Sequence, residues 1–132
     1  MSRQYTKEQI IFNAKAATGT GLSILVEDFQ HVLLTLSSAS SANFTIKFQA
    51  SNSDTAPTFS SAQSVTNRWD YIQVKDLQSG TAIGGDTGVA FAGTDDVRLF
   101  EVNSSGQKWL CATITARSAG AVTLTTKPFN NE

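Results

Sequence analysis

The sequence is poor in the residues that build cross-linked or metal-bound folds. Among its 132 residues there is a single cysteine, Cys111, and a single histidine, His31. An intrachain disulfide therefore cannot form, which excludes a disulfide-built scaffold. No histidine cluster is available to hold a metal ion. Cys111 lies in the stretch KWLCATITA, where we expect it to be a small, partly buried strand residue.

Charge is also scarce. Charged residues make up 16% of the chain and the formal net charge is -1, whereas soluble domains average about 25% charged residues. Since there is no run of Lys or Arg, nothing attracts a phosphate backbone over long range, and we expect no nucleic-acid partner. No apolar segment approaches the roughly 18 residues of a membrane span, and the first residues lack the apolar core of a signal peptide. We therefore expect a soluble protein that is made in the cytosol and does not associate with a membrane.

What the chain has instead is alternation of apolar and polar residues. In residues 43–49, NFTIKFQ, the side chains of Phe44, Ile46 and Phe48 share one face. The same period predicts strands at residues 22–29, 31–37, 43–50, 69–77, 88–92, 97–103, 108–116 and 121–126. Short Ser- or Gly-containing segments at residues 37–43, 103–107 and 117–121 predict turns, and the polar segment 51–67 predicts a long loop.

This pattern predicts one all-β domain, a jelly-roll-like antiparallel β-sandwich over residues 18–132, preceded by an N-terminal arm over residues 1–17. We expect the arm to pack on the body or on a neighbouring subunit. Its consecutive apolar residues, Ile10, Ile11 and Phe12, are candidate interface residues. The alternative is that they cover the open end of their own domain.

Signals for catalysis or for a cofactor are weak. His31 falls inside the patterned run FQHVLLTL, which favours a strand-end residue over a catalytic base. The segment 81–96 is rich in Gly and Asp, but it lacks the Lys and Ser/Thr of a phosphate loop and the spacing of a calcium loop. We read it as turns, with a calcium site completed by other loops as the alternative. We therefore expect no enzymatic activity, no catalytic residue, no cofactor and no metal ion.

Trp69 and Tyr71 are the remaining candidate interface residues. In RWDYIQVKDL, alternation places them on the face opposite Ile72 and Val74. One interpretation is that Trp69 lies at the rim of the sandwich, half-buried under the loop 51–67. The others are a subunit interface and a platform on which a carbohydrate stacks.

Two segments carry a resemblance to known proteins. Residues 67–80, NRWDYIQVKDLQSG, and residues 88–126, GVAFAGTDDVRLFEVNSSGQKWLCATITARSAGAVTLTT, resemble small β-sandwich virion proteins of tailed bacteriophages. In those proteins a Y-x-x-V-x-D-L-x-S/T-G strand precedes a V-R-x-F-E-V-N-x-x-G-x-x-W/Y-L hairpin, and a G-x-x-V-T-L strand closes the domain. The resemblance extends over residues 19–126, nearly the whole chain.

The resemblance implies a capsid decoration (cement) or head-fibre protein. Such a protein binds the phage major capsid protein on the outer capsid surface of the virion and stabilises the assembled head as a homo-oligomer, most often a trimer. Related domains serve as carbohydrate-binding, tail, baseplate or fibre modules. We keep this as the alternative, with a carbohydrate partner not favoured.

Overall fold

The computed structural model describes residues 4–5, 7–92 and 97–130, and over these ranges its regular elements are strands. The strands are β1 (Gln4–Tyr5), β2 (Gln9–Lys15), β3 (Gly19–Thr20), β4 (Ile24–Leu25), β5 (His31–Ser51), β6 (Asp70–Ile72), β7 (Val74–Asp76), β8 (Ala82–Ile83), β9 (Val89–Ala92), β10 (Val97–Asn103) and β11 (Trp109–Asn130). The predicted all-β fold is confirmed. In the described part of the chain no helix is long and apolar enough to cross a membrane.

The long strands β5 and β11 form the spine of the molecule. They pair antiparallel over their whole lengths, from Trp109 opposite Ser51 to Phe129 opposite His31. The turns predicted at residues 37–43 and 117–121 are therefore wrong, because both strands run through these segments. The register shifts there, and Ser41 (φ 52°) and Gly120 (φ 79°) adopt positive φ. Bulges of this kind bend a strand without ending it.

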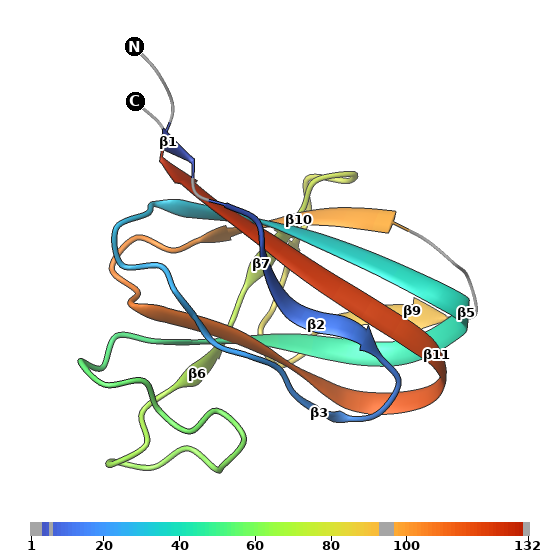
Figure 1. The fold of residues 1–132 in the computed structure, drawn as a ribbon, viewed down its shortest axis with the longest axis horizontal. Coiled ribbons are helices and arrows are strands. Elements are labelled where there is room, and N and C mark those ends of the chain that lie inside the picture. Colours follow the sequence, from blue (N-terminus) through green and yellow to red (C-terminus); the bar gives the residue numbers. More distant parts are fainter. Residues whose placement is uncertain (1–3, 6, 93–96, 131–132) are drawn as a thin grey trace.

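The bend converts one antiparallel sheet into two facing layers. The first half of β5 pairs with the second half of β11 and with β10. The second half of β5 pairs with the first half of β11, with β6 and with β9. Figure 1 shows β5 and β11 sweeping together around the right-hand end of the molecule, from one layer into the other. The sandwich is thus a single curled sheet.

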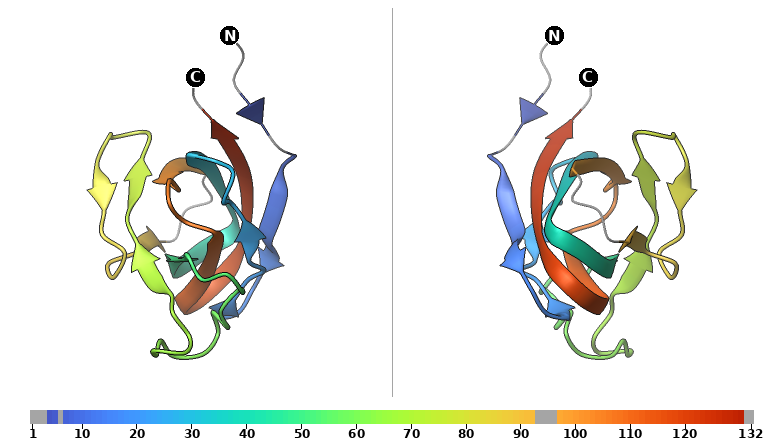
Figure 2. Two further views of the ribbon diagram at one scale, coloured as in Figure 1. Left: turned by 90° about the vertical axis from the view of Figure 1, so that its left-hand side faces the viewer. Right: turned by 90° about the vertical axis from the view of Figure 1, so that its right-hand side faces the viewer.

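The other strands flank this spine on opposite sides. Strands β1, β2, β3 and β4 all pair with β11, along the edge that β5 leaves free. Strands β6, β9 and β10 pair with the other edge of β5, and β7 and β8 extend the sheet beyond β10. In the two views of Figure 2 the N-terminal strands and the strands of residues 70–92 lie on opposite sides of the central ribbon.

Between the layers lies the hydrophobic core. Along β5 the even-numbered side chains of residues 32–36 and 42–50 are buried, because the strand keeps the same inward face on both sides of the bend. The largest fully buried apolar side chains are Phe48, Phe100, Leu34, Leu36, Ile46, Leu110, Ile114 and Leu124.

The described part of the N-terminal segment belongs to this sheet. Strand β2 pairs with β11, and Ile11 and Phe12 are each 3% exposed within the core. The expected boundary between residues 17 and 18 falls between β2 and β3, which pair with the same strand. The sequence left open whether these apolar residues contact a neighbouring subunit or cover their own domain. In the structure, Ile11 and Phe12 are buried in their own domain. Ile10 is the exception, at 47% exposed.

The other predicted strands agree with the observed strands to different degrees. The one predicted at residues 97–103 is confirmed as β10, and that at 88–92 is confirmed as β9 within one residue. The one predicted at 22–29 shortens to β4. The one predicted at 69–77 is interrupted at Gln73, because β6 pairs with β5 whereas β7 pairs with β10 and β8. The chain passes there from one layer to the other.

Candidate functional site

The connection between β5 and β6 is the largest irregular element in the described chain. The loop predicted at residues 51–67 is confirmed, with an isolated bridge between Ser64 and Asn67 inside it. In Figure 1 it projects from the lower left of the body. Loops of this length in compact domains are uncommon unless they serve a function or are disordered.

Asn67 organises this loop. Its Oδ1 accepts a hydrogen bond from the backbone N–H of Thr58 at 2.8 Å. Its Nδ2 donates to the carbonyl oxygens of Thr58 (3.0 Å), Ala62 (3.0 Å) and Ser61 (3.3 Å). A single side chain therefore satisfies backbone groups in the middle of the loop and ties residues 58–62 to its end.

The loop is also anchored to the sheet. Phe59 is 6% exposed, and the buried Gln49 of β5 donates from Nε2 to its carbonyl oxygen at 2.9 Å. At the two ends of the loop, Ser51 Oγ donates to the carbonyl oxygen of Arg68 at 2.5 Å, and Trp109 Nε1 donates to that of Ser53 at 3.0 Å. These contacts fix the loop to the sheet at its middle and at both ends, and it is called the braced loop from here on.

Trp69 lies under this loop, as the rim interpretation predicted for it, and Tyr71 lies beside Trp69. Both are half-buried, and Trp69 Nε1 donates to the carbonyl oxygen of Ser61 at 3.0 Å. Their ring centroids are 5.1 Å apart with an interplanar angle of 77°. Rings that stand nearly perpendicular do not form the flat, coplanar platform that the carbohydrate interpretation required. The Lys47 ammonium lies 5.1 Å from the centre of the Tyr71 ring.

A cleft of about 430 Å³ opens between this loop and the turn that follows β10. Its walls come from β5, the end of the loop, the start of β6 and that turn. The polar and aromatic residues that line it include Asn52, Ser64, Arg68, Trp69, Asp70 and Gln107. A second cleft, of about 480 Å³, lies within the loop itself and includes Val65, which is 89% exposed.

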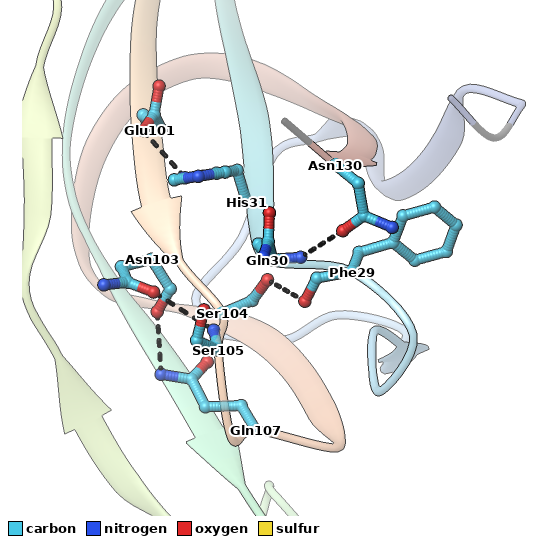
Figure 3. A network of polar contacts seen from close by, with 9 residues as sticks. All are labelled: Phe29, Gln30, His31, Glu101, Asn103, Ser104, Ser105, Gln107 and Asn130. Atoms are coloured by element: carbon cyan, nitrogen blue, oxygen red, sulfur yellow. Dashed lines mark hydrogen bonds and ion pairs between the residues drawn. The ribbon is translucent and has the colours of Figure 1, made fainter. Parts of the chain in front are cut away.

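The turn at residues 103–107, predicted from NSSGQ, forms the second wall and is held by its own polar contacts (Figure 3). Asn103 Oδ1 accepts from the backbone N–H of Ser105 at 3.1 Å. Ser104 Oγ donates to the carbonyl oxygen of Phe29 at 2.9 Å, and Gln107 Nε2 donates to that of Asn103 at 3.2 Å. The turn is therefore fixed both internally and to the segment before β5.

His31 lies at the start of β5, as predicted for a strand-end residue. Its Nδ1 is 3.1 Å from Glu101 Oε2, and its ring stacks on that of Phe129 at 5.2 Å (Figure 3 shows the pair with Glu101). Nearby, Asn130 Oδ1 accepts from the backbone N–H of Gln30 at 2.8 Å. These contacts link β5, β10 and the end of β11.

Two further titratable groups are enclosed by the fold. Burial raises the pKa of the Cys111 thiol to about 11. Burial also opposes ionisation of Asp76, but hydrogen bonds from the backbone of Gln78 and from Arg98, with the Arg98 charge, outweigh it and lower the pKa of this carboxyl below 3.8. Arg98 Nη2 lies 2.8 Å from Asp76 Oδ2.

The acidic residues do not gather into a site within the described residues, where no group of three or more His, Cys, Asp or Glu side chains could hold a metal ion. In the segment 81–96, the described residues form β8, β9 and a turn in which Gly88 N–H donates to the carbonyl oxygen of Gly84 at 3.1 Å. Residues 93–96, with Asp95 and Asp96, lie outside the described residues.

The structure thus brings Trp69 and Tyr71 together and places Ile11 and Phe12 in the core, away from the loop. Sequence reasoning missed Asn67, Arg68 and Gln107. Nothing local distinguishes these polar residues in a polar loop and turn, because their roles arise from contacts across the fold.

Comparisons with known proteins find similarity in fold alone. No family model matches the chain, and a search of curated proteins finds no match. Among solved structures, the SPBc2 prophage-derived protein YomS aligns with a TM-score of 0.71 at 12% identity, over 98% of this chain and 96% of that one. The PBSX exported protein XepA aligns with a TM-score of 0.71 at 14% identity, over 98% of this chain and 39% of that one. The chain therefore spans well under half of XepA.

Proposed function

We propose that this chain is a non-enzymatic structural protein of a bacteriophage or prophage, which acts by binding a surface. The observation that carries this proposal is the fold shared along 98% of this chain and 96% of YomS, a prophage-derived protein. The resemblance of residues 67–80 and 88–126 to virion proteins of tailed phages points the same way.

Within this class we favour a capsid decoration protein that binds the major capsid protein on the outside of the head and stabilises it as a homo-oligomer, with a trimer as the expected state. A sheet that curls around one core and a loop braced by Asn67 give a rigid body suited to a lattice. An attached tail, baseplate or fibre role is the alternative, since the same body would serve there.

The contact surface differs from the one that the sequence suggested. Ile11 and Phe12 are enclosed in the core, so they are not free to grip a neighbour. An exposed apolar patch lies elsewhere, where Leu77 (39% exposed), Val97 (67%) and Leu99 (43%) line a hollow of about 280 Å³. Exposed apolar side chains that gather in this way are typical of interaction sites. We propose this patch as the subunit contact.

Solution mass together with co-sedimentation on empty phage capsids tests the proposal. We expect an oligomer that sediments with the shells until its sites are saturated. Leu99→Ser should convert the oligomer to monomers, whereas Val65→Ser, at an exposed position outside the patch, should leave the mass unchanged. A monomeric protein that stays in the supernatant at every concentration contradicts capsid decoration.

Deleting residues 1–17 is unsuitable as a test of attachment. The deletion removes Ile11 and Phe12 from the core together with all of β2. A loss of binding would then report unfolding rather than a lost contact.

A further inference from the structure

We propose that the cleft of about 430 Å³ between the braced loop and the turn after β10 binds a saccharide. The proposal concerns a ligand of the cleft and does not depend on attachment to a capsid. The volume lies within the range of about 300–1,000 Å³ that small-molecule sites occupy.

The first argument is the set of polar groups that the fold leaves unused. Among the described residues, no hydrogen bond or ion pair involves the exposed Arg68 guanidinium, although Arg68 lines the cleft. Asp70 uses Oδ1, which accepts from Gln63 Nε2 at 3.1 Å and from the N–H of Tyr71 at 2.8 Å. Its Oδ2 has no such partner in the described chain. The cleft therefore offers free donors and free acceptors side by side.

The opposite wall is shaped by Gln107. Its Nε2 donates a hydrogen bond to the carbonyl oxygen of Asn103, and its Oε1 is enclosed by the protein, so this side chain does not offer an open acceptor to the cleft. Asn52 and Ser64 contribute an amide and a hydroxyl to the same cleft. These groups both donate and accept hydrogen bonds.

The mixture of charges indicates the class of ligand. A phosphate or carboxylate suits Arg68 but would face the like charge of Asp70, and an ammonium group has the reverse problem. A hydroxyl group donates and accepts, so neighbouring hydroxyls of a sugar can accept from Arg68 and donate to Asp70. Trp69 adds an apolar ring on which the C–H face of a sugar can pack.

A peptide is a poorer match for the same cleft. Peptides that bind to sheets usually add a strand at an exposed edge. Here Ser51 is paired with Trp109, and Ala50 is paired with both Asp70 and Leu110. The backbone beside the cleft is therefore already engaged in the sheet.

Both walls are fixed before a ligand arrives. Asn67 and Phe59 hold the loop, and Ser104 holds the turn. A ligand that enters does not have to order these segments, which lowers the entropic cost of binding.

An NMR titration of the full chain tests the proposal, with glucose, galactose, N-acetylglucosamine and rhamnose as separate probes, each raised to about 100 mM to detect weak binding. We expect at least one sugar to shift the Trp69 indole N–H, the Arg68 side-chain signals and the Gln107 side-chain amide together. The signals of β2, which pairs with β11 on the other side of the spine, should not move.

Matched variants make the result specific. Arg68→Ala should weaken binding of that sugar about tenfold or more, as expected when a charged hydrogen bond is lost. Lys75→Ala removes the same charge from an exposed position on β7 and should leave the affinity unchanged. The proposal is overturned if none of the sugars shifts these signals, if Arg68→Ala and Lys75→Ala bind equally well, or if short peptides shift the cleft signals and sugars do not.

Discussion

Replacing Phe12 by alanine should remove a substantial share of the stability of this domain. Phe12 is 3% exposed, lies opposite Leu124 in the sheet and packs in the core. Truncating a buried phenylalanine costs about 3–5 kcal/mol, because transfer free energy is lost and a cavity remains. Domains of this kind are stable by about 5–15 kcal/mol. With a urea m-value of about 2 kcal/mol/M, the unfolding midpoint should fall by about 2 M.

The same strand offers the control. Ile10 lies two residues away in β2 but is 47% exposed, so Ile10→Ala loses about half of the transfer free energy and leaves no enclosed cavity. Ile10→Ala should therefore lower the free energy of unfolding by less than about 1 kcal/mol. Urea unfolding followed by tryptophan fluorescence and by far-UV circular dichroism measures both variants.

The comparison decides whether the N-terminal segment is part of the folding core. If Phe12→Ala unfolds at the same urea concentration as Ile10→Ala, then β2 is dispensable for the body and the segment behaves as a separate arm. A large cost for Phe12→Ala alone supports the sheet described above.

Three further predictions concern the enclosed titratable groups and the bend. Because the pKa of Asp76 is lowered from 3.8 in the folded state, its contribution to the free energy of unfolding is complete above pH 3.8 and is lost as the pH falls through the folded pKa. In acid titrations the parent should therefore lose stability more steeply than Asp76→Asn. Equal slopes for the two proteins would contradict this. Because the pKa of Cys111 is raised from 9.0 to about 11, the parent should lose stability as the pH rises between these values, and Cys111→Ala should lose less in alkaline urea titrations. At the bend, Gly120→Ala introduces a side chain at φ 79° that overlaps Ala42 and should cost about 2–4 kcal/mol. Gly106→Ala, at φ 82° with nothing within 4 Å, should cost about 1 kcal/mol, and equal melting temperatures would show that the corner is not close-packed.

The period of two in the sequence was enough to identify the fold class and the inward faces of the strands. In residues 72–75 the alternation is confirmed, since Val74 is buried, Ile72 is half-buried, and Gln73 and Lys75 are exposed. The turn at residues 103–107 and the loop at 51–67 followed from composition in the same way. These features depend on local properties of the chain, which a sequence records.

The continuity of β5 and β11 could not be predicted in this way. Segments such as SSASSAN have the composition of a turn, and whether the chain reverses or only bends depends on a partner strand far away in the sequence. Here the bulged segments of β5 and β11 face one another, with Ala39 paired to Ala121 and Asn43 to Ala119. Small residues permit the two strands to approach closely, but their presence in the sequence does not show which segments will pair.

The cleft was beyond sequence reasoning for a related reason. Its walls come from residues 50–52, from residues 64 and 68–70 and from the turn at residues 106–107, and the fold alone brings them together. The aromatic pair Trp69 and Tyr71 drew attention to the right region. The perpendicular geometry of the two rings, and the free Arg68 beside them, became visible only with the side chains in place.

The shared spine has a consequence for how this protein unfolds. Each layer contains half of β5 and half of β11. Neither layer can therefore unfold while the other stays intact, and the molecule should unfold as one cooperative unit. Joining these two strands also requires contacts between residues far apart in the sequence, such as His31 with Phe129. Such contacts make folding slow, and once formed they oppose any local peeling of one layer from the other.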